Sequence, residues 1–83
     1  MLASISLYRT LGILALTTTL QLNGQPLTVP APISLAQLVD RLGYTGKRIA
    51  VECNGEIVPR SRYGETALVD GDRLEIVVAV GGG

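Results

Sequence analysis

Residues 74–83 read LEIVVAVGGG, an apolar run that ends on three glycines. The run has no polar residue between positions 76 and 80, which is typical of a strand covered on both faces in the middle of a sheet. Glycine loses the most conformational freedom on ordering, so residues 81–83 are a poor continuation of a packed strand. They suit an extended tail that enters a channel too narrow for side chains, although frayed chain ends are also common. We therefore expect a central strand over 73–80 and a flexible tail over 81–83.

The composition limits the classes of function that are open to the chain. Its 83 residues are 47% apolar and 17% charged, which indicates one small globular domain. Seven basic and seven acidic residues cancel, so the net charge gives no electrostatic argument for nucleic-acid binding. The sequence has no histidine, so the usual general base is missing. Its single cysteine, Cys53, cannot form a disulfide within the chain or a metal site built from cysteines. We expect partner enzymes to act on this chain.

The N-terminal part of the chain differs from the rest. Residues 1–18 are apolar and carry one charge, Arg9. The apolar core at 11–16 is much shorter than the about 20 residues of a transmembrane helix, and no A-x-A cleavage pattern follows it. Three interpretations are open: a leader without a role in the fold, a start site placed too far upstream, and a segment that packs on the domain. We favour the first two, and we expect a domain over 19–80 without membrane association.

Two pairs of short segments alternate polar and apolar residues, as half-buried strands do. Each pair is joined by Asn-Gly, the strongest short hairpin signal, because a type I′ turn needs positive φ at both central residues. The predicted hairpins are 19–22 with 26–29 around Asn23-Gly24, and 49–53 with 56–59 around Asn54-Gly55. Asp70 and Asp72 flank Gly71 at a third turn, and turn chemistry explains them better than a metal site.

A short amphipathic helix is predicted between the hairpins. Ser34 and Gln37 have the spacing of a capping box, and Gly43 stands where a helix C-terminus favours glycine. One apolar stripe is formed by Leu35, Leu38, Val39 and Leu42. A helix of about ten residues must pack on another surface to be stable, and a sheet is the available one. The chain order predicts an α+β fold, a mixed sheet of about four to five strands with one helix across it and the last strand parallel to the first.

Four stretches together resemble the bacterial sulfur carrier proteins of thiamine biosynthesis, the ThiS family. They are LQLNG at 20–24, VECNGEIVPRSRY at 51–63, VDGD at 69–72 and VGGG at 80–83. The N-G-E-x-V-P-R stretch, the D-G-D turn and the V-G-G-G end are specific in combination. A terminal di-glycine alone is shared with the molybdopterin-synthase small subunit and with ubiquitin-like proteins. The resemblance covers 20–83, leaves 1–18 without a counterpart, and implies a β-grasp (ubiquitin-like) fold.

The resemblance implies a carrier that enzymes act on, and not an enzyme. The Gly83 carboxylate would attack the α-phosphate of ATP on a ThiF-type adenylating enzyme, and a persulfide sulfur would then displace AMP and leave a thiocarboxylate. Thiazole synthase (ThiG) would take that sulfur into the thiazole ring of thiamine. Gly81 and Gly82 would let Gly83 reach a buried nucleotide through a narrow groove. ATP and magnesium would belong to the adenylating partner, so we expect no cofactor or metal on this chain and a cytoplasmic location.

Two other functions share the fold and the tail. A carrier of the molybdopterin-synthase type would use the same activation chemistry. A ubiquitin-like modifier would instead join its C-terminal carboxyl group to a substrate lysine through an isopeptide bond. A plain interaction domain with an inert tail is the remaining alternative.

A few other side chains are candidates for supporting roles. Arg60 and Arg62 could dock the adenylating enzyme or thiazole synthase, or could be solvated loop charges, and both interpretations stay open. Cys53 could be a second sulfur site, but we favour a structural role, because free cysteine often behaves as a small apolar residue. Tyr63 is predicted to pack against one end of the core.

Overall fold

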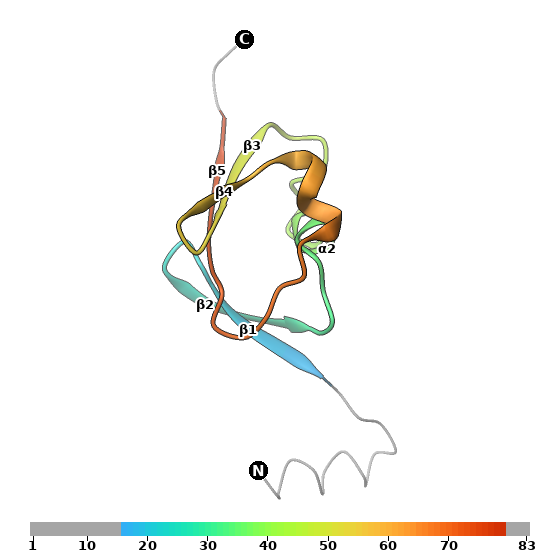
Figure 1. Ribbon diagram of the computed structural model, residues 1–83, viewed down its shortest axis with the longest axis vertical. Helices are drawn as coiled ribbons and strands as arrows, with labels where there is room; N and C mark the ends of the chain where they lie inside the picture. The colour runs from blue at the N-terminus through green and yellow to red at the C-terminus, as the bar shows by residue number, and fades with distance from the viewer. Residues whose placement is uncertain (1–15, 80–83) are drawn as a thin grey trace, which may run out of the picture.

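The computed structural model describes residues 16–79, which form a mixed five-stranded sheet crossed by one α-helix (Figure 1). Along the chain the elements are β1 (Thr17–Leu22), β2 (Gln25–Pro30), α2 (Leu35–Arg41), β3 (Ile49–Cys53), β4 (Glu56–Val58), the 3-10 helix η1 (Arg60–Glu65) and β5 (Arg73–Val78). The strand order is β2-β1-β5-β3-β4, so the last strand lies in the middle of the sheet. The α+β fold predicted from the sequence is confirmed.

The register of β5 explains why the sheet is mixed. β5 runs antiparallel to β3, from Leu74 opposite Cys53 to Val78 opposite Ile49. It runs parallel to β1 on its other side, where Leu74 lies beside Leu22. The prediction that the last strand is central and parallel to the first is therefore confirmed.

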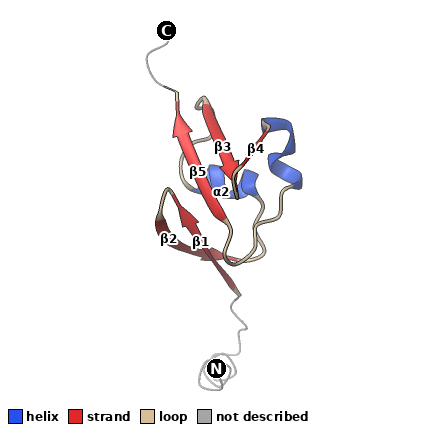
Figure 2. Cartoon of the chain, turned by 60° about the vertical axis from the view of Figure 1, so that its left-hand side comes forward, coloured by secondary structure: helices blue, strands red, loops and turns tan. Residues whose placement is uncertain are grey.

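The expectation that β5 is covered on both faces is wrong. Leu74 and Ile76 are buried, at 1% and 5% exposed, whereas Val77 is 63% exposed. The reason is that α2 lies on one side of the sheet (Figure 2). Side chains on the other face of β5 therefore meet solvent. Ile57 of β4, which is 65% exposed, lies on the same uncovered face. A continuous apolar run therefore does not by itself prove a three-layer arrangement.

β1 begins two residues earlier than the pattern predicted. Thr17 and Thr18 pair with Pro30 and Val29 of β2, and Thr18 is 6% exposed. Three consecutive threonines hide the alternation of polar and apolar residues, although β-branched side chains favour a strand. The expected boundary between residues 18 and 19 therefore moves to the start of β1. The interpretations of the preceding segment concern residues that the structure does not describe.

The cap of α2 has the predicted form. The Ser34 hydroxyl accepts a hydrogen bond from the Gln37 N–H at 3.1 Å, and the Gln37 side-chain oxygen accepts one from the Ser34 N–H at 2.9 Å. Gly43 follows the helix at φ +82°, a conformation that favours glycine. The helix has seven residues and is shorter than expected. Within the described residues, no helix has the length and apolar character needed to cross a membrane.

The core lies between α2 and the inner face of the sheet. Leu35 and Leu38 of α2 are fully buried, at 0% exposed. They belong to one cluster with Leu20, Val29, Ile33, Val39, Val51, Tyr63, Leu68, Leu74 and Ile76. Among the described residues, the five with less than 2% exposure are leucine or valine, so branched aliphatic side chains supply the centre of this small core.

The connection after β4 contains a helix that the sequence did not predict. Residues 60–65, expected to be a polar connection, form η1, which packs beside α2. Tyr63 points from η1 into the core and is 8% exposed, as predicted for a packing residue. Short 3-10 segments have no apolar repeat that a sequence pattern could reveal.

Candidate functional site

The structure describes the base from which the predicted tail extends. Gly81, Gly82 and Gly83 lie outside the described residues, so their assigned roles remain predictions. The described chain leads to Ala79, directly after β5. The candidate site therefore consists of β5 and the residues around its C-terminal end.

Both hairpin turns hold β5 through their asparagine side chains. The Asn23 side-chain oxygen accepts the Ile76 N–H at 2.9 Å, and its amide nitrogen donates to the Ile76 carbonyl at 3.3 Å. The Asn54 side-chain oxygen accepts the Arg73 N–H at 2.9 Å. Each asparagine also has the positive φ of its turn, 52° at Asn23 and 54° at Asn54. These residues therefore fix the turn and the neighbouring strand at once.

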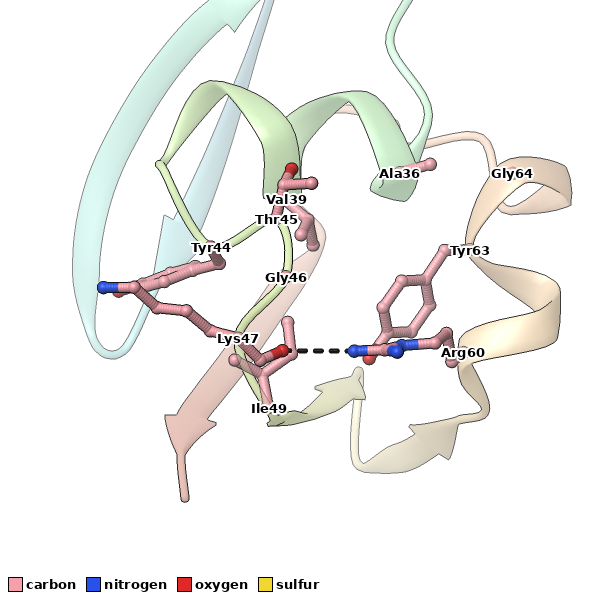
Figure 3. A pocket seen from close by; sticks show the side chains of 10 residues that line it. All are labelled: Ala36, Val39, Tyr44, Thr45, Gly46, Lys47, Ile49, Arg60, Tyr63 and Gly64. Carbon is pink, nitrogen blue, oxygen red and sulfur yellow. Dashed lines mark hydrogen bonds between the residues drawn. The ribbon is translucent and has the colours of Figure 1, made fainter. Parts of the chain in front are cut away.

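Hydrogen bonds to two consecutive backbone carbonyls, those of Lys47 and Arg48, link η1 and the C-terminal end of β5 to the same loop. The Ala79 N–H donates to the Arg48 carbonyl at 2.8 Å. The Arg60 guanidinium donates from Nη2 to the Lys47 carbonyl at 3.1 Å (Figure 3). Arg60 is thus held against the loop that pairs with the last described residue. This places Arg60 at the end of the sheet from which the tail extends.

A half-open hollow of about 340 Å³ lies at this end. Its lining residues are Ala36, Val39, Tyr44, Thr45, Gly46, Lys47, Ile49, Arg60, Tyr63 and Gly64 (Figure 3). Aliphatic and aromatic side chains therefore line it together with two cations, Lys47 and Arg60. Arg62 is exposed on η1 and does not line the hollow. The two arginines that the sequence marked as docking candidates thus occupy different surroundings.

Cys53 lacks the environment of a reactive thiol. The pKa of Cys53 is raised above its ordinary value of 9.0, first by burial and then by the nearby carboxylates of Asp72 and Glu56. A nucleophilic or persulfide-bearing cysteine needs a stabilised thiolate and therefore a lowered pKa. This supports the structural role predicted for Cys53.

Asp70 and Asp72 serve the third turn. Asp70 Oδ1 accepts the Thr19 N–H at 2.7 Å, and Asp72 Oδ2 accepts the Val69 N–H at 2.9 Å. Asp72 Oδ1 also accepts from the Asn54 side-chain amide at 2.9 Å. The carboxylates thus bond to backbone and side-chain N–H groups, in agreement with the predicted turn chemistry. Between residues 16 and 79, no group of three or more His, Cys, Asp or Glu side chains could hold a metal ion.

Residues 16–79, with the last strand central in the sheet and one α-helix across it, define a β-grasp domain. Carriers and modifiers of this class share the glycine tail that is expected to follow β5, so the assignment to one family rests on the comparison with known proteins. The model of the ThiS family matches residues 18–83, and the chain belongs to the ThiS family.

Solved structures with the same fold support this assignment. The crystal structure of the thiamine biosynthesis protein ThiS from Geobacter metallireducens is 32% identical, with a TM-score of 0.68, and the match covers 80% of this chain and 100% of that one. The solution structure of a thiamine biosynthesis protein from the same organism is also 32% identical, with a TM-score of 0.67 and coverage of 80% and 88%. The β-grasp fold implied by the sequence is therefore confirmed.

Sequence relatives differ in how much of their length they share with this chain. A thiazole synthase of Paramagnetospirillum magneticum is 44% identical over 64 residues, which are 77% of this chain and 20% of that protein. The uncharacterized protein ycf40 of Pyropia yezoensis is 40% identical over 65 residues, 78% of this chain and 92% of that protein. This chain therefore spans about a fifth of the length of its thiazole synthase relative.

Proposed function

We propose that this chain is a sulfur carrier of thiamine biosynthesis that bears sulfur as a thiocarboxylate on Gly83. The observation that carries the proposal is membership of the ThiS family over residues 18–83, a range that includes the glycine tail. The central position of β5 supports it, because a strand paired on both sides is a rigid base for a tail. The chain acts in this proposal as a substrate that enzymes modify.

The chemistry explains why a carrier needs partner enzymes. A carboxylate is a poor acyl donor, so a Gly83 oxygen attacks the α-phosphorus of ATP and pyrophosphate leaves. The terminal sulfur of an enzyme persulfide then attacks the acyl carbon, and AMP leaves with the electron pair of the broken C–O bond. Cleavage of the resulting S–S bond by a thiol releases the thiocarboxylate. ATP and magnesium are bound by the adenylating enzyme in this scheme.

Three partner enzymes follow from this proposal. A ThiF-type enzyme adenylates Gly83, a persulfide enzyme supplies the sulfur, and thiazole synthase accepts it for the thiazole ring. The relatives support the last of these, because a segment similar to this chain forms a fifth of a protein named thiazole synthase. Gly81 and Gly82 let the tail extend into a narrow channel of the partner enzyme, since glycine fits where a side chain would not.

Intact-mass measurement tests the proposal. The purified chain is incubated with a ThiF-type enzyme, ATP and a persulfide enzyme, and its mass should rise by the difference between sulfur and oxygen. A chain that lacks Gly83 is the control for oxidation and should show no gain. Absence of any gain in the wild-type chain contradicts the proposal, and larger conjugates would indicate a ubiquitin-like modifier. Rescue of a thiamine auxotroph, without rescue of molybdenum-enzyme activity, separates this carrier from the molybdopterin type.

A further inference from the structure

The balanced net charge conceals a separation of charges along β5. Three carboxylates and one cation, Arg73, lie around the start of β5. The carboxylates are those of Glu56, which pairs with Cys53, of Asp70, and of Asp72, which immediately precedes the strand. Lys47 and Arg48 directly precede Ile49, which pairs with Val78 at the other end of β5. The neutral total therefore includes one acidic and one basic end of the sheet.

Three exposed cations, Lys47, Arg48 and Arg60, form what we call the basic end. Arg60 belongs to it because its guanidinium binds the Lys47 carbonyl. One carboxylate, that of Asp40, also borders this region, where it accepts the Thr45 hydroxyl at 2.8 Å. The cations still outnumber it, so this end presents net positive charge to a partner.

Hydrogen bonds fix the basic end relative to the start of the tail. Arg48 accepts the Ala79 N–H through its carbonyl, and the preceding carbonyl, that of Lys47, accepts the Arg60 guanidinium. Gly83 is the fourth residue after Ala79, and four fully extended residues span at most about 14 Å. An enzyme that acts on Gly83 must therefore bring its surface against this end of the domain.

We propose that the basic end is the docking surface for an acidic surface of thiazole synthase around the entrance that receives the tail. Among the enzymes that would act on Gly83 we choose thiazole synthase, because a segment similar to this chain forms part of a protein of that name. The inference rests on the proposed function and adds Lys47 and Arg48 to it. The hollow beside these cations, with Tyr44, Ile49 and Tyr63 in its wall, accepts an apolar side chain of the same partner. Exposed opposite charges across an interface raise the association rate and weaken in salt.

Binding of the full chain to purified thiazole synthase from the same organism tests this surface. The dissociation constant is measured by calorimetry at low and high salt for the wild type and for Lys47→Glu, Arg48→Glu and the double variant. Within residues 16–79, the side chains of Lys47 and Arg48 make no hydrogen bonds, so these changes leave the described bonds in place. Arg73→Glu is the matched control for each single reversal, because it makes the same change of charge at the opposite end of β5.

The double reversal should weaken binding about tenfold or more at low salt and flatten its salt dependence, whereas the control should stay within about twofold of wild type. The double variant Lys47→Gln with Arg48→Gln should show an intermediate loss of affinity. It removes the positive charges without introducing carboxylates, so its loss cannot come from repulsion by new acidic side chains. Equal dissociation constants for the double variant and the control, with circular dichroism confirming that both are folded, would overturn the docking surface. So would a wild-type chain that does not bind thiazole synthase.

The mass measurement keeps the two proposals separate. A wild-type chain that gains sulfur, while its charge variants bind like the control, refutes the docking surface and leaves the carrier function standing. A chain that binds through its basic end but never gains sulfur contradicts the carrier function.

Discussion

Replacement of Asn23 by glycine tests how the base of the tail is held in place. Ile76 is 5% exposed, and its N–H and carbonyl both bond to the Asn23 side chain. A buried N–H that loses its partner costs about 1–3 kcal/mol, and a second, longer bond adds about 0.5–1 kcal/mol. Glycine adopts φ 52° without strain, so Asn23→Gly isolates the side-chain bonds. We expect a loss of about 2–3 kcal/mol in unfolding free energy, or about 10–20 °C in Tm.

Urea denaturation followed by circular dichroism measures this loss, and hydrogen exchange of the Ile76 amide locates it. Asn54→Gly is the matched control, because Asn54 has φ 54° in the same type of turn but makes exposed bonds. It should cost about 1 kcal/mol, since water replaces exposed partners. Asn23→Ala should cost about 1 kcal/mol more than Asn23→Gly because of its positive φ. If Asn23→Gly is as stable as Asn54→Gly, with unchanged exchange at Ile76, the side chain does not clamp β5.

Three further changes test the core, the helix cap and the thiol. Leu38→Ala should lower the unfolding free energy by about 2–5 kcal/mol in urea, because Leu38 is fully buried against the sheet. Ser34→Ala should cost about 1 kcal/mol in the same assay by removing one bond of the capping box. Because the pKa of Cys53 is raised in the folded chain, the unfolded thiol ionises first as pH rises, and stability should fall above pH 9.0. Cys53→Ala should remove that part of the pH dependence, and a slope unchanged by the substitution would refute the assignment.

The sequence predicted the order of the elements because its strongest signals are local. Asn-Gly at 23–24 and 54–55 fixed both hairpins, and the Ser34–Gln37 spacing located the helix start. Exposure of Val77 could not be predicted in the same way, because it depends on whether a second layer covers the sheet. An apolar run is compatible with either arrangement, so only the structure decides between them.

The arrangement around the site depends on contacts between distant residues. Asn23 binds Ile76, and the two are 53 positions apart in the chain. Asn-Gly was interpreted through its turn alone, since nothing in the sequence shows which strand lies beside that turn. Likewise, Arg60 was a candidate from its position after β4, but its bond to the Lys47 carbonyl depends on how η1 packs. The sequence therefore indicated one cation of the basic end and missed Lys47 and Arg48.

Acidic and basic side chains lie at opposite ends of β5, which explains why a net charge of zero is a poor guide to the partners of this chain. β5 has six residues, and a strand rises about 3.3 Å per residue, so its ends lie about 20 Å apart. Charges are screened within about 8 Å at physiological ionic strength. A partner at the end of β5 therefore interacts with Lys47, Arg48 and Arg60, and the acidic turns at the other end compensate for little of their charge. Because Gly83 can reach only a short distance from Ala79, an enzyme that binds Gly83 must meet the positive end.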